Sequence, residues 1–242
     1  MSSIQTTAFP ARLNNQTLLV DADDTLWENN IYFERAIAAF ISYLDHHVHT
    51  ADEVREHLNV CERATIAAHG YGIRSFRRSL VNCFEQLSES PISPERHAQI
   101  VSFTDAIASN EIELLPAVDT TLRELHQRHR IILVTKGDTV EQTDKLERSG
   151  LRPFFNAVEV LAEKNAAAYR DVTIRYKCNP ASAWMIGNSP KSDINPALAA
   201  GLNAVFIPHD FTWVLEHEVV DPPTTGEQLL ELGTFTELLR YF

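Results

Sequence analysis

The hydrophobic residues of this chain gather in short apolar runs that are bounded by polar or turn-forming residues. The first run is Thr17–Val20, and similar runs follow much later in the chain. Runs of this length and composition predict buried strands. The later runs are Arg130–Val134, Ala157–Val160, Ala183–Ile186 and Asn203–Ile207.

Helical patterns separate these later runs. Val118–Arg128 has apolar residues at helical spacing. Thr139–Ser149 is followed by Gly150 and Pro196–Ala200 by Gly201, and glycine commonly ends a helix. Strands that alternate with helices predict an α/β fold with a doubly wound, Rossmann-like parallel sheet. Such sheets bind ligands at the carboxyl ends of their strands.

The segment 31–108 has a different pattern, with no convincing strand and several amphipathic helices. We expect an all-helical domain inserted between the first strand and the rest of the sheet. The core domain would then consist of residues 1–30 and 109–242, and the insert of residues 31–108. The helices expected in the insert include Tyr32–Leu44, Ala51–His69 and Ser75–Leu87.

Composition narrows the classes of function. The chain has 242 residues, 44% of them hydrophobic, which suffices for one large core with a smaller insert. Its formal net charge of −12 disfavours binding to a nucleic-acid backbone and suits a protein that handles small molecules. We therefore expect no nucleic-acid partner.

Cysteine usage and hydropathy bear on the cellular compartment. Cys61, Cys83 and Cys178 are widely spaced and form no CxxC pair, which favours a reducing compartment. No apolar stretch approaches the roughly 20 residues that span a bilayer. The first residues also lack the charged-then-apolar pattern of a signal peptide. We expect a cytoplasmic protein without a membrane partner.

Three acidic residues follow the first predicted strand in the sequence Asp21-Ala22-Asp23-Asp24-Thr25. Asp21 would lie at the carboxyl end of the strand, where Asp21 and Asp23 could approach one site. Anionic groups that converge there need a cation, and Mg²⁺ is the natural choice for oxygen ligands. The alternative is a loop of acidic turn formers with a helix N-cap, which could explain Asp24 alone.

Polar residues also follow two later strands. Thr135, with Lys136 and Gly137 after it, could hold an anion such as phosphate through its hydroxyl and nearby backbone N–H groups. An ordinary strand-to-helix turn would look the same. Lys164 would balance the charge of a nucleophile and a phosphate if it points into the same crevice. A lone lysine is otherwise a solvated surface charge.

The fourth candidate element is the stretch from Gly187 to Ile194. Asn188 and Asp193 offer oxygen ligands for a hard cation, directly or through water. The alternative is an Asn/Ser/Pro turn with Asp193 near a helix start. Trp213 and His209, which follow the last predicted strand, could line the rim of the same site.

Taken together and in this order, the four elements resemble the haloacid dehalogenase-like (HAD) hydrolase superfamily. The helical insert stands where members of that family carry a C1-type cap domain. The matching positions are Asp21, Asp23 and Thr25 in the Asp-x-Asp-x-Thr motif, then Thr135, then Lys164, and finally Gly187-Asn188 through Asp193.

The resemblance implies a role for each residue. Asp21 would attack phosphorus, and Asp23 would act as general acid and then general base. The metal would be Mg²⁺, and its ligands would come from Asp21, Asp23 (through its backbone carbonyl), Asn188 and Asp193. Thr135 and Lys164 would position and neutralise the phosphoryl group. Further substrate contacts are expected from Thr25, Lys136 and Gly137.

The resemblance favours a Mg²⁺-dependent phosphatase that acts on a small phosphorylated metabolite. Asp23 supports this choice, because the dehalogenase branch lacks an acid/base aspartate two residues after the nucleophile. Asn188 departs from the family, where many members carry aspartate. It leaves open a phosphate-binding or regulatory protein without turnover. Another C1-capped activity, a phosphonate hydrolase or a dehalogenase, is also open.

The segment His69–Arg78 is the most distinctive part of the insert, with two glycines, aromatic residues and three arginines. We expect it to form a loop that faces the core site, with Tyr71 and Arg74 in contact with substrate. The alternative is a helix linker with a solvated basic face. Opening and closing of the cap would then control access of substrate and water.

Overall fold

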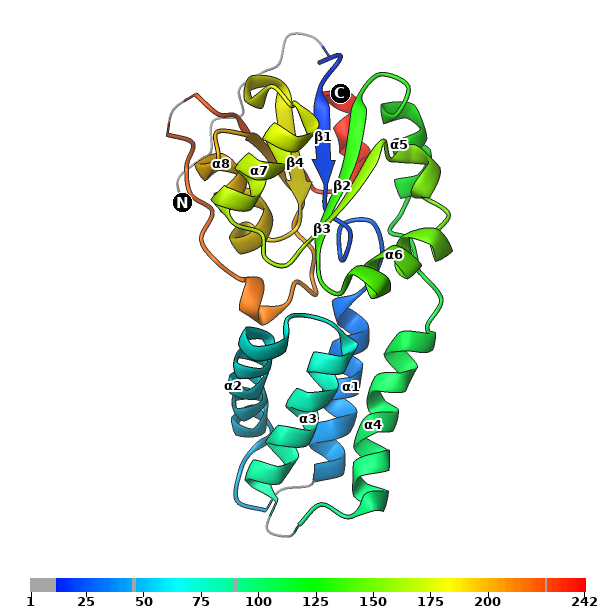
Figure 1. Cartoon of the computed structure of the whole chain (residues 1–242), viewed down its shortest axis with the longest axis vertical. Helices are drawn as coiled ribbons and strands as arrows, with labels where there is room; N and C mark the ends of the chain where they lie inside the picture. The colour runs from blue at the N-terminus through cyan, green and yellow to red at the C-terminus, as the bar shows by residue number, and fades with distance from the viewer. Residues whose placement is uncertain (1–11, 45–46, 89–90, 225) are drawn as a thin grey trace.

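A computed structural model describes residues 12–44, 47–88, 91–224 and 226–242. These residues form an α/β core and, on one side of it, a bundle of four helices (Figure 1). All neighbouring strands of the sheet are parallel, in the order β3-β2-β1-β4-β5-β6. The strands are β1 (Thr17–Val20), β2 (Arg130–Lys136), β3 (Ala157–Leu161), β4 (Ala183–Gly187), β5 (Asn203–Phe206) and β6 (Leu229–Glu231).

The helices divide between the core and the bundle. The bundle helices are α1 (Asn30–Leu44), α2 (Ala51–His69), α3 (Ile73–Leu87) and α4 (Pro94–Ser109). The core helices are α5 (Val118–Leu125), α6 (Thr139–Arg148), α7 (Ala166–Tyr176) and α8 (Asn195–Ala199), with short 3₁₀ turns that include Val214–Glu216 and Phe235–Arg240. The predicted doubly wound sheet with an inserted helical unit is confirmed.

Strand β1 lies in the middle of the sheet because it pairs with β2 on one side and β4 on the other. Leu19 is in register with Ile132 of β2 and with Met185 of β4. Strands β2 and β3 are therefore added on one side of β1, and β4 to β6 on the other. This reversal makes the carboxyl end of β1 a topological switch point. Side chains that follow these three strands are brought to one edge.

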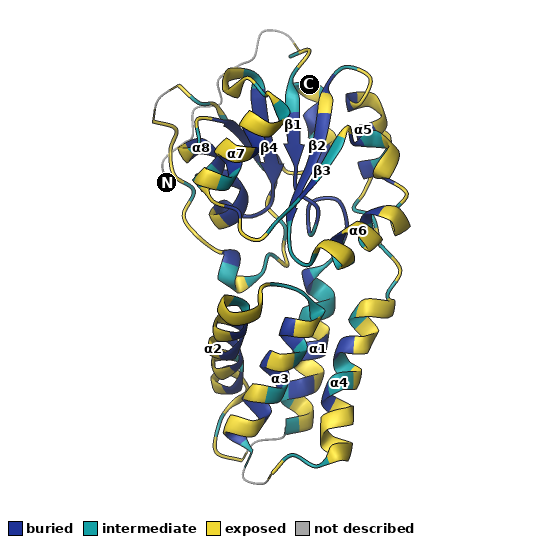
Figure 2. Cartoon of the chain, viewed as in Figure 1, coloured by how far each residue is buried: buried dark blue, intermediate teal, exposed yellow. Residues whose placement is uncertain are grey.

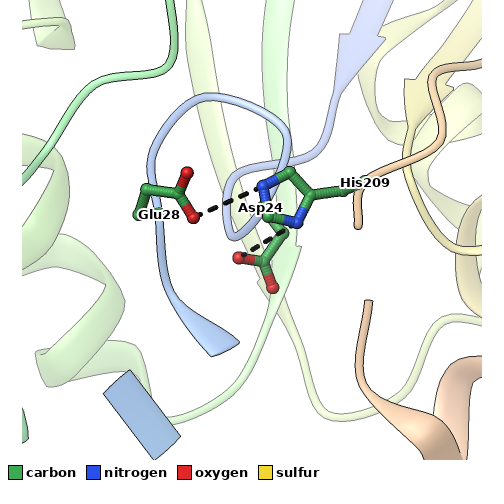
Figure 3. Close-up of side chains that lie close together, drawn as sticks. All are labelled: Asp24, Glu28 and His209. Atoms are coloured by element: carbon green, nitrogen blue, oxygen red, sulfur yellow. Dashed lines mark ion pairs between the residues drawn. The ribbon is translucent and has the colours of Figure 1, made fainter. Parts of the chain in front are cut away.

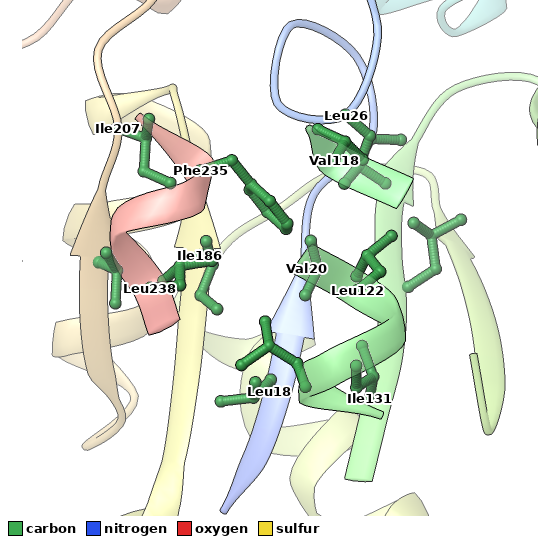
Figure 4. Packing of buried hydrophobic residues seen from close by; sticks show 14 of the residues in the cluster. Leu18, Val20, Leu26, Val118, Leu122, Ile131, Ile186, Ile207, Phe235 and Leu238 are labelled. Atoms are coloured by element: carbon green, nitrogen blue, oxygen red, sulfur yellow. The ribbon is translucent and has the colours of Figure 1, made fainter. Parts of the chain in front are cut away.

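Alternation within the strands explains why both faces of the sheet are covered. Leu18 and Val20 pack on one face against α5 and the last 3₁₀ turn (Figure 4). Leu19 points to the other face, where it packs in a cluster with residues of α7 and α8. Successive strand residues point to opposite faces, so an apolar run without alternation needs helices on both sides.

The four bundle helices pack around a hydrophobic cluster of their own. Phe40, Leu58, Leu80 and Ile100, one from each helix, are fully buried in it. The outer faces of the helices are exposed (Figure 2). This amphipathic pattern is the reason that the sequence signals helices here.

Several elements differ from the sequence-based expectation. The strand β6 was not expected, because three residues are too few for a recognisable apolar run. Helix α7 was also missed, since its sequence AAAYRDVTIRY has a weak amphipathic pattern. Helix α3 already begins at Ile73, so the distinctive loop of the insert is shorter than expected.

Within the described ranges, no helix combines the length and the apolar character that crossing a bilayer requires.

Candidate active site

A cavity of about 300 Å³ lies between the carboxyl edge of the sheet and the helical bundle. Residues after β1, β2 and β4 form its core side, and all four bundle helices contribute to its other side. Trp213 also lines it. The candidate residues that line it are Asp21, Asp23, Tyr71, Thr135, Lys136, Gly137, Lys164, Asn188 and Asp193.

Lys164 lies at the centre of the charged end of this cavity and is buried. Its Nζ donates hydrogen bonds to Oδ1 of Asp21 and, at 2.7 Å, to Oδ1 of Asp193. Burial alone would lower the pKa of Lys164, but the two carboxylates outweigh burial and raise the pKa. The lysine therefore stays charged and joins two acidic residues that are far apart in the sequence.

Asp21 is the carboxylate at the tip of β1. Its Oδ2 accepts a hydrogen bond from the hydroxyl of Thr25 at 2.9 Å. Burial raises the pKa of Asp21, and Asp193 adds to the rise, while Lys164 opposes it. The pKa of Asp21 nevertheless stays raised, at about 7, so Lys164 offsets only part of the effect of burial.

Asp193 holds the loop after β4 in place. One of its oxygens is bound to Lys164, and Oδ2 accepts a hydrogen bond from the backbone N–H of Ser189 at 3.0 Å. Gly187 makes room for this carboxyl, since a Cβ there would lie 2.2 Å from Oδ2. Any side chain at position 187 would therefore displace Asp193. Both carboxylate oxygens already have partners in the protein.

Asn188 points its side-chain oxygen toward Thr25. Its amide nitrogen donates to Oγ1 of Thr212 at 3.2 Å, and its Oδ1 accepts from Thr25 at 3.3 Å. Thr25 therefore bridges Asp21 and Asn188. The resulting donor set at this end of the cavity consists of carboxylate and amide oxygens, which fits a hard cation such as Mg²⁺.

Asp23 lines the cavity, but its carboxylate has partners of its own. Lys145 donates to Oδ1 at 2.7 Å, Gln142 to Oδ2 at 2.9 Å, and the Trp27 indole to Oδ1 at 2.7 Å. Burial would raise the pKa of Asp23, but the Lys145 ion pair and these hydrogen bonds keep the pKa below its usual value. The repulsion between Asp21 and Asp23 is thus offset by two different lysines.

Asp24 has a structural role at the start of α1. It adopts a left-handed backbone conformation with φ 60°, and its Oδ1 accepts from the backbone N–H groups of Asn29 at 2.9 Å and Asn30 at 3.0 Å. Burial raises its pKa to about 7. The reading of Asp24 as a turn and cap residue agrees with these contacts.

His209 lies between Asp24 and Glu28 (Figure 3). Its Nε2 is 3.3 Å from Oε2 of Glu28, and its Nδ1 is 3.9 Å from Oδ1 of Asp24. In the described part of the chain, these three form the one His/Cys/carboxylate group whose ligand atoms lie within 4.8 Å of one another. The group joins the loop after β5 to the start of α1. His209 itself is not among the residues that line the cavity.

Lys136 links the core to the bundle. Its Nζ contacts Oε1 of Glu216 at 2.6 Å and Oγ of Ser192 at 2.7 Å, and it lies 4.5 Å from the centre of the Tyr71 ring. The Tyr71 hydroxyl donates to Glu163 at 2.8 Å. Tyr71 therefore faces the core, as expected. No sequence pattern points to Glu216, which follows Lys136 by 80 residues.

Arg74 lies elsewhere. It is exposed on α3 and, of the residues that the structure describes, it is not one that lines the cavity. The contact between α3 and the core is made instead by Glu141 of α6, whose Oε2 accepts from the backbone N–H of Ile73 at 3.0 Å. Gly72 permits this approach, because a Cβ there would lie 3.1 Å from the Glu141 carboxylate.

Comparison with known proteins places these observations in a family context. The model of the haloacid dehalogenase-like hydrolases matches residues 16–201. The solved structure of a haloacid dehalogenase-like family hydrolase from Xanthomonas campestris superposes with a TM-score of 0.80 and 27% identity, covering 94% of this chain and 91% of that one.

Two characterised relatives match a smaller part of the chain. A glyceraldehyde 3-phosphate phosphatase from Methanothermobacter thermautotrophicus is 32% identical over 103 residues, 40% of this chain and 46% of that protein. The human N-acylneuraminate-9-phosphatase is 30% identical over 108 residues, 43% of this chain and 41% of that protein. The matched region therefore spans less than half of the length of either relative.

Proposed function

The chain belongs to the haloacid dehalogenase-like hydrolases, and we propose that it is a Mg²⁺-dependent phosphatase of small phosphomonoesters. The observation that carries this proposal is the pairing of two carboxylates with different environments at one end of the cavity. Asp21 accepts a hydrogen bond from Lys164. Asp23, two residues after Asp21, accepts one from Lys145. Such a pair can divide nucleophilic and acid/base work between its members.

In the first step, an Asp21 oxygen attacks phosphorus, and the bond from phosphorus to the alcohol oxygen breaks. Asp23 supplies the proton that the leaving alcohol takes up, for which it must first be protonated against the low pKa that the Lys145 ion pair gives it. Lys164 contacts Asp21 and could neutralise charge on the phosphoryl oxygens. The hydroxyl of Thr135, which lines the same cavity, could donate a hydrogen bond to them. The product of this step is an aspartyl-phosphate on Asp21.

In the second step, water attacks phosphorus and the bond from phosphorus to Asp21 breaks. Asp23 takes the proton of that water, which requires the carboxylate form. The ion pair with Lys145 favours this form because it keeps the pKa of Asp23 low. Phosphate leaves, and the carboxylate of Asp21 is restored.

The residues that would hold Mg²⁺ are Asp21, Asn188 and the backbone carbonyl of Asp23. A bound Mg²⁺ supplies charge neutralisation for the phosphoryl group. Asp193 would either hold the metal as well or orient the loop after β4, where its oxygens contact Lys164 and the backbone N–H of Ser189. The four-helix bundle would serve as the cap, since it closes the cavity opposite Asp21.

A phosphate-binding protein without turnover is the second candidate, and Asn188 favours it. An amide oxygen can bind Mg²⁺ but brings no negative charge, so the site has one negative charge fewer than in the many family members that carry aspartate at this position.

The two characterised relatives act on a triose phosphate and a sugar-acid phosphate according to their names. They support a small phosphomonoester and leave the alcohol group open.

Phosphate release from an aryl phosphate and from a panel of phosphorylated metabolites tests the proposal. The purified protein should release phosphate with Mg²⁺, lose this activity with a chelator, and regain it when Mg²⁺ is added back. Binding of these compounds without any release would favour the second candidate. Chloride release from haloacids, with no phosphate release, would show a dehalogenase instead.

A further inference from the structure

The cavity extends from the charged site into the helical bundle, where most of the side chains that line it are apolar, with Ser75 and Ser79 among them. The side chains of Phe33, Ile37, Ile66, Phe76 and Ile107 line this part. They come from all four bundle helices, and nothing in the reaction at Asp21 requires them. An apolar chamber of this kind suits the carbon skeleton of a ligand.

Glu62 lies deep in this apolar chamber. Helix α2 ends at His69 beside the core, seven residues after Glu62, which corresponds to about 10 Å along the helix axis. Ile37 lies equally far along α1 from its first residue, Asn30, whose side chain is bound to the core. Glu62 and Ile37 therefore stand at the end of the cavity that is remote from Asp21.

The carboxyl of Glu62 is buried without a complete set of partners. The residue is 5% exposed, and its Oε2 accepts no hydrogen bond from the described residues. A buried polar atom without a partner costs free energy, so native proteins keep few of them. Glu62 lines the cavity, which makes a ligand able to reach it.

The charged residues around Glu62 do not remove the need for a partner. Arg55, one of these, donates a hydrogen bond from Nη2 to Glu34 at 2.8 Å, while its Nη1 has no hydrogen-bond partner in the described residues; Arg55 does not line the cavity. Burial raises the pKa of Glu62 to about 7, Arg55 and Arg63 lower it, and Glu34 raises it. These effects together leave a buried carboxyl, which a hydrogen-bond donor from a ligand would stabilise.

We propose that Glu62 selects the substrate by accepting a hydrogen bond from the end of the alcohol group that is remote from the phosphate. The substrate class is then a phosphomonoester with an apolar skeleton that ends in a hydroxyl or an amine. This inference rests on the proposed function, because the phosphate must lie at Asp21 for the far end to reach Glu62. A ligand without a donor would leave the carboxyl buried and unpaired.

A matched set of synthetic phosphates tests the inference. The set consists of ω-aminoalkyl, ω-hydroxyalkyl and n-alkyl phosphates of equal chain length, over a range of lengths. We expect the wild-type protein to favour an amino or hydroxyl ester over the alkyl ester by at least about tenfold in kcat/KM at one optimal length. Which of the two donors is favoured identifies the chemistry of the natural substrate. Equal values for all three would overturn the inference.

Two substitutions and a control separate recognition from structure. Glu62→Leu should reverse the preference toward the alkyl ester, and Glu62→Gln should keep the preference for the hydroxyl ester but lose that for the amine. Glu56→Leu, on the exposed face of the same helix, should change neither ratio. Unchanged ratios in Glu62→Leu would contradict the inference. A lower Tm in Glu62→Leu would indicate a structural ion pair with Arg55, whereas we expect an equal or higher Tm.

Failure of this inference is distinguishable from failure of the proposed function. If no phosphate ester is hydrolysed, an aryl phosphate included, the phosphatase proposal is wrong. The same matched esters are then compared by calorimetric binding, with the dissociation constant in place of kcat/KM. A preference for the donor-bearing esters that Glu62→Leu abolishes would support Glu62 as the recognition residue, and equal affinities would exclude it.

Discussion

Two buried carboxyls lie at opposite ends of the same cavity, and their environments differ. Asp21 accepts hydrogen bonds from Lys164 and Thr25, so its charge is compensated by the protein itself. Oε2 of Glu62 has no such donor in the described residues. Burial raises the pKa of both groups, but only at Asp21 does a lysine oppose the rise by direct contact.

This difference shows that the protein supplies all the hydrogen-bond partners of the carboxyl at one end of the cavity, and that at the other end it leaves an acceptor for a ligand. Under the proposed function, the charged end has internal counter-ions because the same phosphoryl chemistry would take place there in every cycle. The remote end has apolar walls and one open acceptor, which is an arrangement that chooses among ligands. Substitutions at the two ends should therefore have different consequences.

The largest expected effect is that of Asp21→Asn. The variant keeps the shape of the side chain but removes the nucleophile, so kcat for an aryl phosphate should fall by at least about 10⁴-fold. The protein should still fold, because Lys164 keeps its ion pair with Asp193. Steady-state phosphate release measures the effect. Asp171→Asn, at an exposed position of α7, is the control. Full activity in Asp21→Asn would refute the mechanism.

The second effect is that of Lys164→Met, which leaves Asp21 and Asp193 facing each other without a cation. We expect kcat to fall about 10³-fold, because charge on the phosphoryl group loses a partner. The free energy of unfolding should also fall, by about 3 kcal/mol, since two buried carboxylates lose their counter-ion. Denaturant unfolding and kinetics measure both changes. Lys191→Met, on an exposed side chain, should leave them unchanged.

A third prediction concerns the pH dependence of stability at the remote end. The pKa of Glu62 is about 7 in the folded protein, above its value of about 4.5 in the unfolded chain. The folded state therefore binds the proton more tightly, and this contribution to stability is present at acidic pH and lost as the pH rises through 7. Glu62→Gln lacks this term, which amounts to at most about 3 kcal/mol.

Urea unfolding at pH 5 and pH 8 checks this prediction. The wild type should lose more unfolding free energy between the two conditions than Glu62→Gln does. Glu56→Gln serves as the control, because its carboxylate is exposed, and it should behave as the wild type. An identical pH dependence in Glu62→Gln and the wild type would mean that Glu62 titrates normally.

The smallest effect is expected for the contact between α3 of the bundle and α6 of the core, which joins the two sides of the cavity. Glu141→Ala removes the acceptor of the Ile73 N–H and so weakens the contact between α3 and the core. We expect KM to rise about fivefold, which corresponds to about 1 kcal/mol for one hydrogen bond, with a smaller change in kcat. Glu147→Ala, on the exposed face of the same helix, should change neither constant. A change confined to kcat would argue against a role in closing the cavity.

Much of the core could be predicted from the sequence, because buried parallel strands leave a local pattern. The apolar runs became β1 to β5, and the segment without strands became the helices of the bundle. The missed elements, β6 and α7, are short or weakly amphipathic. The position of Asp21 at the tip of β1 also followed from local pattern, because a residue directly after a strand lies at its end.

The partners of the candidate residues could not be predicted in the same way. Lys145 binds Asp23 from 122 residues away, and Glu216 binds Lys136 from 80 residues away. The charge of Arg74 suggests a substrate contact, but its place on α3 leaves it exposed to solvent. Glu62 looks like any acidic residue of an amphipathic helix until the other helices surround it.

The sequence by itself determined the succession of β1 to β5 and of most helices, the family resemblance and the residue types at the strand ends. These features depend on neighbours within a few positions, where side-chain periodicity and turn chemistry act. Only the tertiary structure decided which lysine compensates which aspartate and which acid of the bundle is left without a donor. Those outcomes depend on the environment that distant segments create, because burial and counter-ions together set the free energy of a charge.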